Sequence, residues 1–396
     1  MATLLGTGIS AKLDSFTAGK EAALNAYYQI GKNDPGIVIT FISPIFDQQE
    51  TIRGIRSITR DTQLIGCSSI GAISSYGSHK DSVAVFIISS DSMLFSCGIG
   101  DKVSKSPGLA GNKTVIKALG LTNKSKLKQA YMMFSDGASG QSANILRGSQ
   151  EVLGTGFPII GGGACNKTCD RKTYQYMDSE ALSDSVSGAL ISGDIRLGIG
   201  TSNGWQPLGK THKITKARSN TIKEIDKKIA VRLYEEYFEK SIEELKNYGI
   251  CALGITYPIG TRSANFDDYI TRVPIAIDDA GGLLLNGDIK EEDDISLMIG
   301  DKDAVLESAK KAATSAVKDI SYAKIKFAAI FSDMARLLVL KDDAYKEMDA
   351  VKEVLGRNIP ILGCYTFGEY APSDAKESHG QCNFNNHSIS ITLFSE

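Results

Sequence analysis

Three stretches of the chain share one pattern of apolar and polar positions. Each is a short apolar run that reaches a glycine and continues with small or hydroxyl-bearing residues. Such a run predicts a buried strand followed by a glycine-rich turn, where backbone amides and small side chains can approach a bound molecule. The three stretches are Gln63–Ile73, Phe157–Cys165 and Ile359–Tyr370.

The surroundings of these stretches repeat as well. Upstream of each lies another apolar run that ends in serine, and a helical segment separates the two runs. A crossover of this kind makes its two strands parallel, and the alternating strand that follows can then pair antiparallel. The upstream runs end at Ser43, Ser135 and Ser332, and the alternating strands begin at Ser82, Ser185 and Ser388.

The pattern therefore predicts a mixed α/β fold. Repeated strand–helix–strand–turn–strand units form mixed sheets flanked by helices, and the pattern leaves open whether they share one sheet. At 396 residues the chain is long enough for two related domains. The first, 1–215, holds units at about 37–101 and 129–201. The second, 216–396, holds a degenerate unit at about 249–300 and a clear unit at 326–396.

Periodicity and capping residues predict the remaining elements. Helices are expected at 17–30, 142–153, 220–247 and 303–320, with Asp47 and Glu50 forming an N-cap pair for the helix of the first unit. Strands are expected at 4–9, 249–256, 268–277 and 295–299.

Composition restricts the classes of function. Hydrophobic content of 42%, charged content of 23% and a net charge of −2 are ordinary for a soluble globular protein and give no basic surface for nucleic acid. No apolar window reaches the roughly 20 residues of a membrane helix, and the first residues lack the pattern of a secretory signal. The sequence predicts a cytoplasmic protein with neither nucleic acid nor membrane as a partner.

The seven cysteines are scattered and odd in number, which argues against a disulfide framework and favours reduced, partly buried thiols. The one close spacing, Cys165 to Cys169, is weak evidence for zinc. No Walker sequence or dinucleotide-binding glycine motif occurs in strand–helix context. The sequence therefore predicts no metal and no cofactor.

Taken in order, several segments resemble the FIST family (F-box and intracellular signal transduction), a paired N-terminal and C-terminal sensory module. The N-terminal half is similar at Ala18–Ala23, Leu64–Gly71 and Ile159–Ala164, the joint at Asn203–Gly209, Lys213–Ala217 and Glu224–Asp226, and the C-terminal half at Asp278–Ile299, Phe331–Leu338 and Pro360–Glu369. The resemblance implies a sensor that binds a small molecule, an amino acid or related metabolite, and implies no catalytic mechanism. Where the family commonly has Ser-Cys-x-x-Arg, this chain has Asp333 after Ser332.

The candidate ligand site centres on Arg336. A guanidinium suits a ligand carboxylate because its fork makes two parallel bonds, and the alternative is a structural pair with a nearby acid. Arg272 lies inside an apolar strand, and the same two roles, ligand binding or structure, are open for it. Glu369 is expected to receive an ammonium group or to hold an arginine. The other candidates are Ser332, Asp333, Tyr365, Thr366, Cys364, Cys67 and Ser68.

These residues lead to one arrangement and three functional readings. Arg336, Asp333, Glu369 and Tyr365 are expected to face a common cleft, with Tyr365 and Glu369 on one strand face unless Gly368 forms a bulge. The favoured function is a sensor that binds an amino acid or small carboxylate and signals through a separate output protein. The alternatives are an enzyme with Cys67 or Cys364 as nucleophile, and a scaffold whose ligand site has decayed. The oligomeric state is left open.

Overall fold

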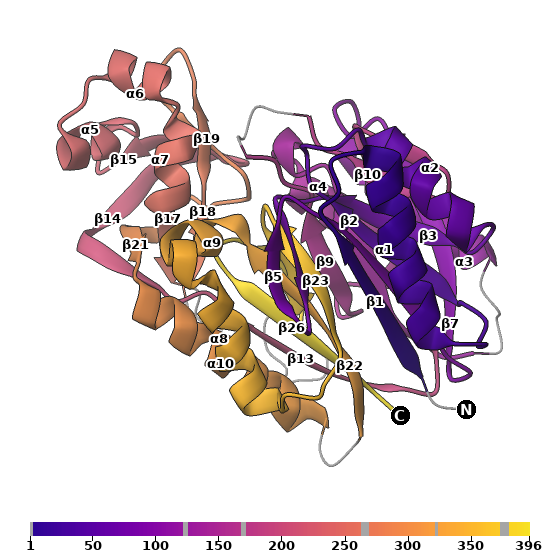
Figure 1. The fold of residues 1–396 in the computed structure, drawn as a ribbon. Coiled ribbons are helices and arrows are strands. Elements are labelled where there is room, and N and C mark those ends of the chain that lie inside the picture. Colours follow the sequence, from indigo (N-terminus) through magenta and orange to yellow (C-terminus); the bar gives the residue numbers. More distant parts are fainter. Residues whose placement is uncertain (1–2, 122–125, 168–171, 263–268, 321–323, 373–379) are drawn as a thin grey trace.

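The computed structural model describes residues 3–121, 126–167, 172–262, 269–320, 324–372 and 380–396. These residues form four sheets flanked by helices, which confirms the mixed α/β prediction. Three of the sheets belong to three units of the same topology. A further region, inserted within the third unit, forms the fourth sheet (Figure 1). None of the described helices is long and apolar enough to cross a membrane.

The first unit sets the topology that the other two repeat. Its sheet order is β1-β6-β2-β3, with β2 and β3 parallel and β6 antiparallel to both of its neighbours. The side chains of Asp14 and Asp47 cap its two helices by accepting from the amides of Thr17 and Glu50. The elements are β1 (Leu4–Ser10), α1 (Ser15–Ile30), β2 (Ile37–Ile42), α2 (Gln48–Thr59), β3 (Leu64–Ser68) and β6 (Val83–Ser89).

The second and third units keep this order, as β7-β12-β8-β9 and β13-β26-β22-β23. The second unit comprises β7 (Met93–Asp101), α3 (Pro107–Leu121), β8 (Lys128–Ser135), the 3-10 turn η1 (Gly137–Ser139), α4 (Ser142–Leu153), β9 (Ile159–Gly163) and β12 (Ser185–Gly193). The third comprises β13 (Arg196–Ser202), α8 (Lys302–Ile320), β22 (Ile325–Asp333), α9 (Met334–Leu340), the 3-10 turn η2 (Lys341–Asp343), α10 (Ala344–Leu355), β23 (Ile361–Thr366) and β26 (Ile389–Ser395).

Each unit also gives a hairpin to the sheet of another unit, in a cycle. The hairpin of the first unit extends the third sheet, that of the second extends the first sheet, and that of the third extends the second sheet. The three units are therefore interlocked, and none of the three sheets is built by one unit alone. The hairpins are β4 (Gly71–Ser74) with β5 (Gly77–Lys80), β10 (Gln175–Met177) with β11 (Glu180–Leu182), and β24 (Glu369–Pro372) with β25 (Cys382–Asn385).

The three sheets share one apolar core. Phe41, Phe134 and Phe331 occupy the same register position in the three units and contact one another, with ring centroids 5.4 to 6.4 Å apart. The recurring place of glycine in the sequence pattern has a packing cause. A Cβ atom at Gly66, Gly161 or Gly363 would lie 1.9 to 2.1 Å from a carbonyl oxygen of the parallel neighbour strand.

Register corrects one predicted equivalence. Ser135 and Ser332 occupy corresponding strand ends, because each lies opposite the residue two places after its unit's glycine. Ile42 holds that position in the first unit, and Ser43 corresponds instead to Asp136 and Asp333. The residues that correspond to Ser43 at the carboxyl ends of the three strands are therefore Asp136 and Asp333, and not Ser135 and Ser332.

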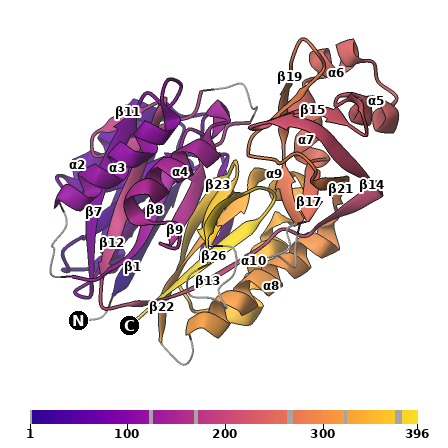
Figure 2. The same ribbon diagram turned by 180° about the vertical axis from the view of Figure 1, so that it is seen from behind.

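Residues 205–300 form the inserted region, which sits between β13 and α8 at one end of the third unit (Figures 1 and 2). It has its own apolar core, and the strand pairs found among its described residues are antiparallel. The described residues of this region therefore do not form the parallel strand pair that a degenerate fourth unit would have. Its elements are β14 (Trp205–Arg218), β15 (Thr221–Ile225), β16 (Lys228–Ile229), α5 (Arg232–Phe238), α6 (Ile242–Tyr248), α7 (Ile250–Thr256), β17 (Ile259–Arg262), β18 (Tyr269–Arg272), β19 (Pro274–Ile277), β20 (Leu283–Leu285) and β21 (Asp294–Gly300).

Two predicted elements of this region are wrong. The helix expected at 220–247 is broken into β15, β16, α5 and α6, because Asp226 and Lys227 both have positive φ and form the tight turn of a hairpin. The strand expected at 249–256 is helix α7, since a short apolar run does not by itself distinguish a buried strand from a buried helix.

Candidate functional site

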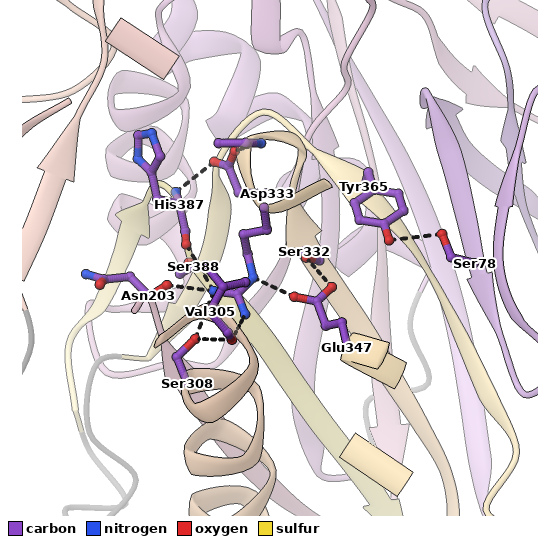
Figure 3. A network of polar contacts seen from close by, with 12 residues as sticks. Ser78, Asn203, Val305, Ser308, Ser332, Asp333, Glu347, Tyr365, His387 and Ser388 are labelled. Carbon is purple, nitrogen blue, oxygen red and sulfur yellow. Dashed lines mark hydrogen bonds and ion pairs between the residues drawn. The ribbon is translucent and has the colours of Figure 1, made fainter. Parts of the chain in front are cut away.

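Arg336 lies at the centre of a fully buried polar network in the third unit. Its Nε donates to the carboxylate of Glu347 on α10 at 2.7 Å, and both side chains are 0% exposed. Glu347 also accepts from the hydroxyl of Ser332 at 3.0 Å. Figure 3 shows Glu347 and Ser332 on one side of the network, with Asn203, Val305 and Ser308 on the other. The sequence leaves two roles open for Arg336: binding a ligand carboxylate, or forming a structural ion pair with a nearby acid. In the structure Arg336 forms the ion pair, with Glu347.

The terminal nitrogens of Arg336 form hydrogen bonds on both sides of the inserted region, just before it begins and just after it ends. Nη1 donates to the carbonyl of Asn203, just before β14, at 2.6 Å. Nη2 donates to the carbonyl of Val305 in α8 at 2.8 Å, after the chain has returned from β21. Further bonds from Nη1 reach Ser308 and the carbonyl of His387. Arg336 therefore joins the entry and exit of the inserted region to the third unit.

Arg272 has a different environment. It lies at the end of β18 and is only 8% exposed, yet its acceptors are main-chain carbonyls: Nε donates to Asp288 and Nη1 to Thr271 and Phe384, each at 3.0 Å. No described acidic side chain forms an ion pair with it. The carboxylate of Asp288 pairs with Arg147 instead. Burial lowers the pKa of Arg272 to about 10, which leaves it charged at neutral pH.

Glu369 lies in the inner face of the second sheet, at the start of β24. Thr366 donates to its Oε1 at 2.6 Å, and Ser388 bonds its Oε2. Burial, together with the nearby charge of Asp333, raises the pKa of Glu369 well above the usual range for a glutamate. Asp333 itself caps α9 at the amide of Ala335 and accepts from the amide of His387, each at 2.8 Å.

The predicted strand shared by Tyr365 and Glu369 does not exist. The chain turns at Gly368, with φ of 85°, so that β23 ends in the third sheet and β24 begins in the second. The hydroxyl of Tyr365 bonds Ser78 on β5 at 2.9 Å, as Figure 3 shows. Gly368, where a bulge was expected, is therefore the residue at which the chain passes from the third sheet to the second.

The candidate cysteines and Ser68 lie in packed surroundings. Cys67 and Cys364 are fully buried in the shared core, and burial raises the pKa of the Cys364 thiol far above its usual range. Cys165, whose pKa is raised to about 12, packs beside them against the carbonyl of Tyr365 at 3.2 Å. The Ser68 hydroxyl accepts from the amide of Tyr174 at 3.0 Å. A protonated thiol is a poor nucleophile, so the buried surroundings of Cys364 do not activate it.

One cysteine corrects the expectation of reduced thiols: Cys251 is disulfide-bonded. Cys67, Cys97, Cys165, Cys364 and Cys382 are free and buried. Cys169 and His379 lie outside the described residues. Within the part of the chain that the structure describes, no group of three or more His, Cys, Asp or Glu side chains is placed to hold a metal ion.

Two residues of this network were not among the sequence candidates. Glu347 was not recognised because it lies in an amphipathic helix. Its position directly before Met348 on the buried face of that helix could have indicated a buried ion pair. His387, fully buried, bonds Thr271 of β18 and the carbonyl of Ile255 in α7, each at 3.0 Å. It docks the inserted region on the third unit, a role that no local pattern indicates.

Solved structures give only weak likenesses. A cyanuric acid hydrolase from A. caulinodans aligns over 100% of both chains with 6% identity and a TM-score of 0.38. A second cyanuric acid hydrolase structure aligns over 100% of both chains with 6% identity and a TM-score of 0.35. PurLQS from Thermotoga maritima aligns over 99% of this chain and 72% of its own, with 8% identity and a TM-score of 0.24. TM-scores of this size support no conclusion about fold or activity.

Sequence comparison is more informative. An uncharacterised protein of Methanocaldococcus jannaschii is 24% identical in an alignment 259 residues long that covers 59% of this chain and 48% of that protein. The chain thus matches less than half the length of this relative. The FIST N domain model matches residues 36–228, and the FIST C domain model matches residues 230–372. Because the two models together span most of the chain, the protein belongs to the FIST family, whose domains are sensory modules implicated in signal transduction.

Proposed function

We propose that this protein is a sensor for a small molecule that carries a carboxylate, such as an amino acid, and that Arg272 receives the carboxylate. The observation that carries the proposal is the environment of Arg272: a guanidinium that is only 8% exposed and bonded to three carbonyls, with no ion pair to any described acid. The nearby charge of Asp288 acts on Arg272, but its carboxylate is paired with Arg147. A buried cation without a direct ion-pair partner is unfavourable, and an incoming carboxylate relieves that cost.

Among the described residues, the hydrogen bonds of Arg272 are made by Nε and Nη1, which leaves Nη2 for a ligand. Nε and Nη1 are committed to the carbonyls of Asp288, Thr271 and Phe384, which fix the plane of the guanidinium. A guanidinium held in this way loses little side-chain entropy on binding, because its carbonyl partners have already ordered it. The carbonyls come from β18, from the segment before β21 and from β25, so a ligand at Arg272 would contact both the inserted region and the hairpin of the third unit.

Arg336 is the weaker candidate for the same role. It is 0% exposed and its charge is balanced by Glu347, so a ligand carboxylate would have to displace an existing ion pair. Glu369 is a poor receptor for an ammonium group because its raised pKa favours the neutral acid. We therefore assign the carboxylate to Arg272, and the signal to a separate output protein that responds to the liganded state.

The test is a thermal-shift and calorimetric screen of free amino acids and small dicarboxylates. The wild-type protein should show saturable stabilisation by at least one carboxylate, since a ligand that binds only the folded state raises its stability. Arg272→Gln should weaken that binding by about a hundredfold, the loss of a charged hydrogen-bond pair. Arg262→Gln, an exposed arginine on the neighbouring strand β17, is the matched control and should bind normally. Normal binding by Arg272→Gln would contradict the assignment.

A further inference from the structure

At two of the interfaces between the three sheets, the hairpin strand of one sheet packs against the two outer strands of the next. At one of these interfaces, β24 of the second sheet packs against β13 and β26 of the third. Glu369 of β24 reaches across it, because its carboxylate is bonded by Ser388 at the start of β26. We call this interface the polar seam and define it by Glu369, Asn385, Thr201, Ser390 and Thr392.

Strand register shows that these five side chains line one interface. Thr201 lies opposite Ser390, which in turn lies opposite the core residue Phe331, so all three are on the inner face of the third sheet. Thr392 follows Ser390 on the same face. On the second sheet Glu369 lies opposite Asn385 and Gly162, in the row of the core residue Phe134.

The corresponding positions at the other two interfaces are less polar. In the interface lined by β10, β7 and β12, Gln175 and Ser187 are polar, and both have partners in Ser185 and the carbonyl of Gly66. Where the third and first sheets meet, β4 packs against β2. By strand register, the four positions there that match Glu369, Thr201, Ser390 and Thr392 are Ala72, Ile9, Ala84 and Phe86. The topology therefore accepts an apolar filling at this place, and the polar seam departs from it.

Four polar atoms of the seam have no hydrogen-bond partner among the described residues. They are Thr201 Oγ1, Ser390 Oγ, Thr392 Oγ1 and Asn385 Nδ2. Ser390 and Thr392 are 0% exposed, whereas Thr201 and Asn385 are half-buried, on the edge strands β13 and β25. Buried polar atoms in folded proteins are almost always bonded, so four neighbouring exceptions point to a missing partner molecule.

We propose that the polar seam binds a small uncharged molecule that offers several hydrogen-bonding oxygens, a polyol or an amide. Three hydroxyl groups can donate or accept, and the amide of Asn385 donates, so the lining suits a ligand with several acceptors. The charged side chains of this region are already committed. Arg336 pairs with Glu347, and Asp333 accepts two amides. Glu369 accepts hydrogen bonds from Thr366 and Ser388. An ionic ligand would enter without a counter-charge, which is unfavourable in a buried site.

The proposal is independent of the role of Arg272, and the test keeps the two apart. The full chain is titrated with glycerol and with acetamide as uncharged compounds, and with acetate and methylammonium as charged ones, and the melting temperature is recorded. At least one uncharged compound should give a saturable rise. The charged compounds are tested in Arg272→Gln, which lacks the proposed carboxylate site, and neither should give a saturable rise there. The response to the uncharged compound should be the same in Arg272→Gln.

Thr392→Val supplies the site-specific variant, because valine keeps the shape of threonine and removes the hydroxyl. It should weaken binding of the uncharged compound by roughly tenfold, the effect of one or two hydrogen bonds, and it should fold normally. Thr7→Val, at a buried threonine of β1, is the matched control and should leave binding unchanged. The proposal is overturned if neither uncharged compound gives a saturable rise, if Thr392→Val binds like the wild type, or if a crystal grown with the compound shows only ordered water in the seam.

Discussion

Arg336 and Arg272 are both nearly excluded from solvent, and their surroundings differ in one respect. Arg336 has a buried carboxylate partner, Glu347, and further acceptors from three segments of the chain. Arg272 has carbonyl acceptors only, and the neighbouring carboxylate of Asp288 is bound to Arg147. Burial alone therefore does not separate a structural arginine from one that can receive a ligand. The presence or absence of a direct ion-pair partner does.

The largest expected difference between the two arginines is in stability. Arg336→Met leaves the carboxylate of Glu347 buried without a cation, so the free energy of unfolding should fall by about 3–5 kcal/mol. Arg272→Met leaves only unbonded carbonyls and should cost about 1–3 kcal/mol. Urea unfolding of both variants measures this. Equal losses in the two variants would show that the buried carboxylate of Glu347 does not depend on Arg336 for its stability. The double variant Arg336→Met with Glu347→Leu removes both charges and should recover part of the loss.

A second comparison uses pH at Glu369. Its pKa is raised in the folded protein, so between the ordinary pKa of a glutamate, about 4.3, and the raised value, the folded state holds a proton that the unfolded chain has lost. The free energy of unfolding should therefore fall as pH rises through this window, by at most about 1.4 kcal/mol per pH unit.

Glu369→Gln removes this dependence, because glutamine does not ionise, and it copies Gln175 at the matching position of the neighbouring interface. The variant should unfold like the wild type near pH 4 and be the more stable protein at alkaline pH. Chemical denaturation at a series of pH values makes the measurement. Parallel curves for the two proteins would mean that Glu369 is ionised in the folded state.

The smallest effects should separate the polar seam from its apolar counterpart. Ala84→Ser introduces a hydroxyl at the position that matches Ser390 in an apolar surrounding, and it should cost about 1–3 kcal/mol. Ser390→Ala removes a hydroxyl that has no partner among the described residues, so stability should be unchanged or higher by about 1 kcal/mol. Thermal unfolding of the two variants is the measurement, and a loss of similar size in both would contradict the contrast between the interfaces.

Much of the fold follows from local pattern. Apolar runs, caps and crossovers predicted the parallel pairs β2–β3, β8–β9 and β22–β23 and the helices α1, α2, α4 and α8. The inserted region was predicted poorly, because its turn at Asp226 and its short apolar run from Ile250 have no distinctive period.

The candidate site was predicted in composition more than in geometry. Ser332, Asp333, Arg336, Thr366 and Glu369 do meet around the third unit, but Tyr365 and Glu369 lie in different sheets and Arg336 pairs with Glu347. The alternation from Ser388 to Phe394 was correctly interpreted as a strand. Such alternation ordinarily marks a strand with one face in solvent, whereas both faces of β26 are buried. The hydroxyl groups of Ser390 and Thr392 are unusual because they are buried, and only the structure shows that burial.

The sequence by itself determined the repeated unit, its strand directions and the family to which the chain belongs, because these depend on the spacing of apolar runs and glycines along one segment. The tertiary structure alone decided which unit receives each hairpin, which acid neutralises which arginine, and which interface is lined by hydroxyl groups. Those outcomes depend on contacts between residues far apart in the chain, such as Arg336 with Asn203 and Glu369 with Gly162. No local propensity encodes them, since each is set by how three interlocked sheets pack around one core.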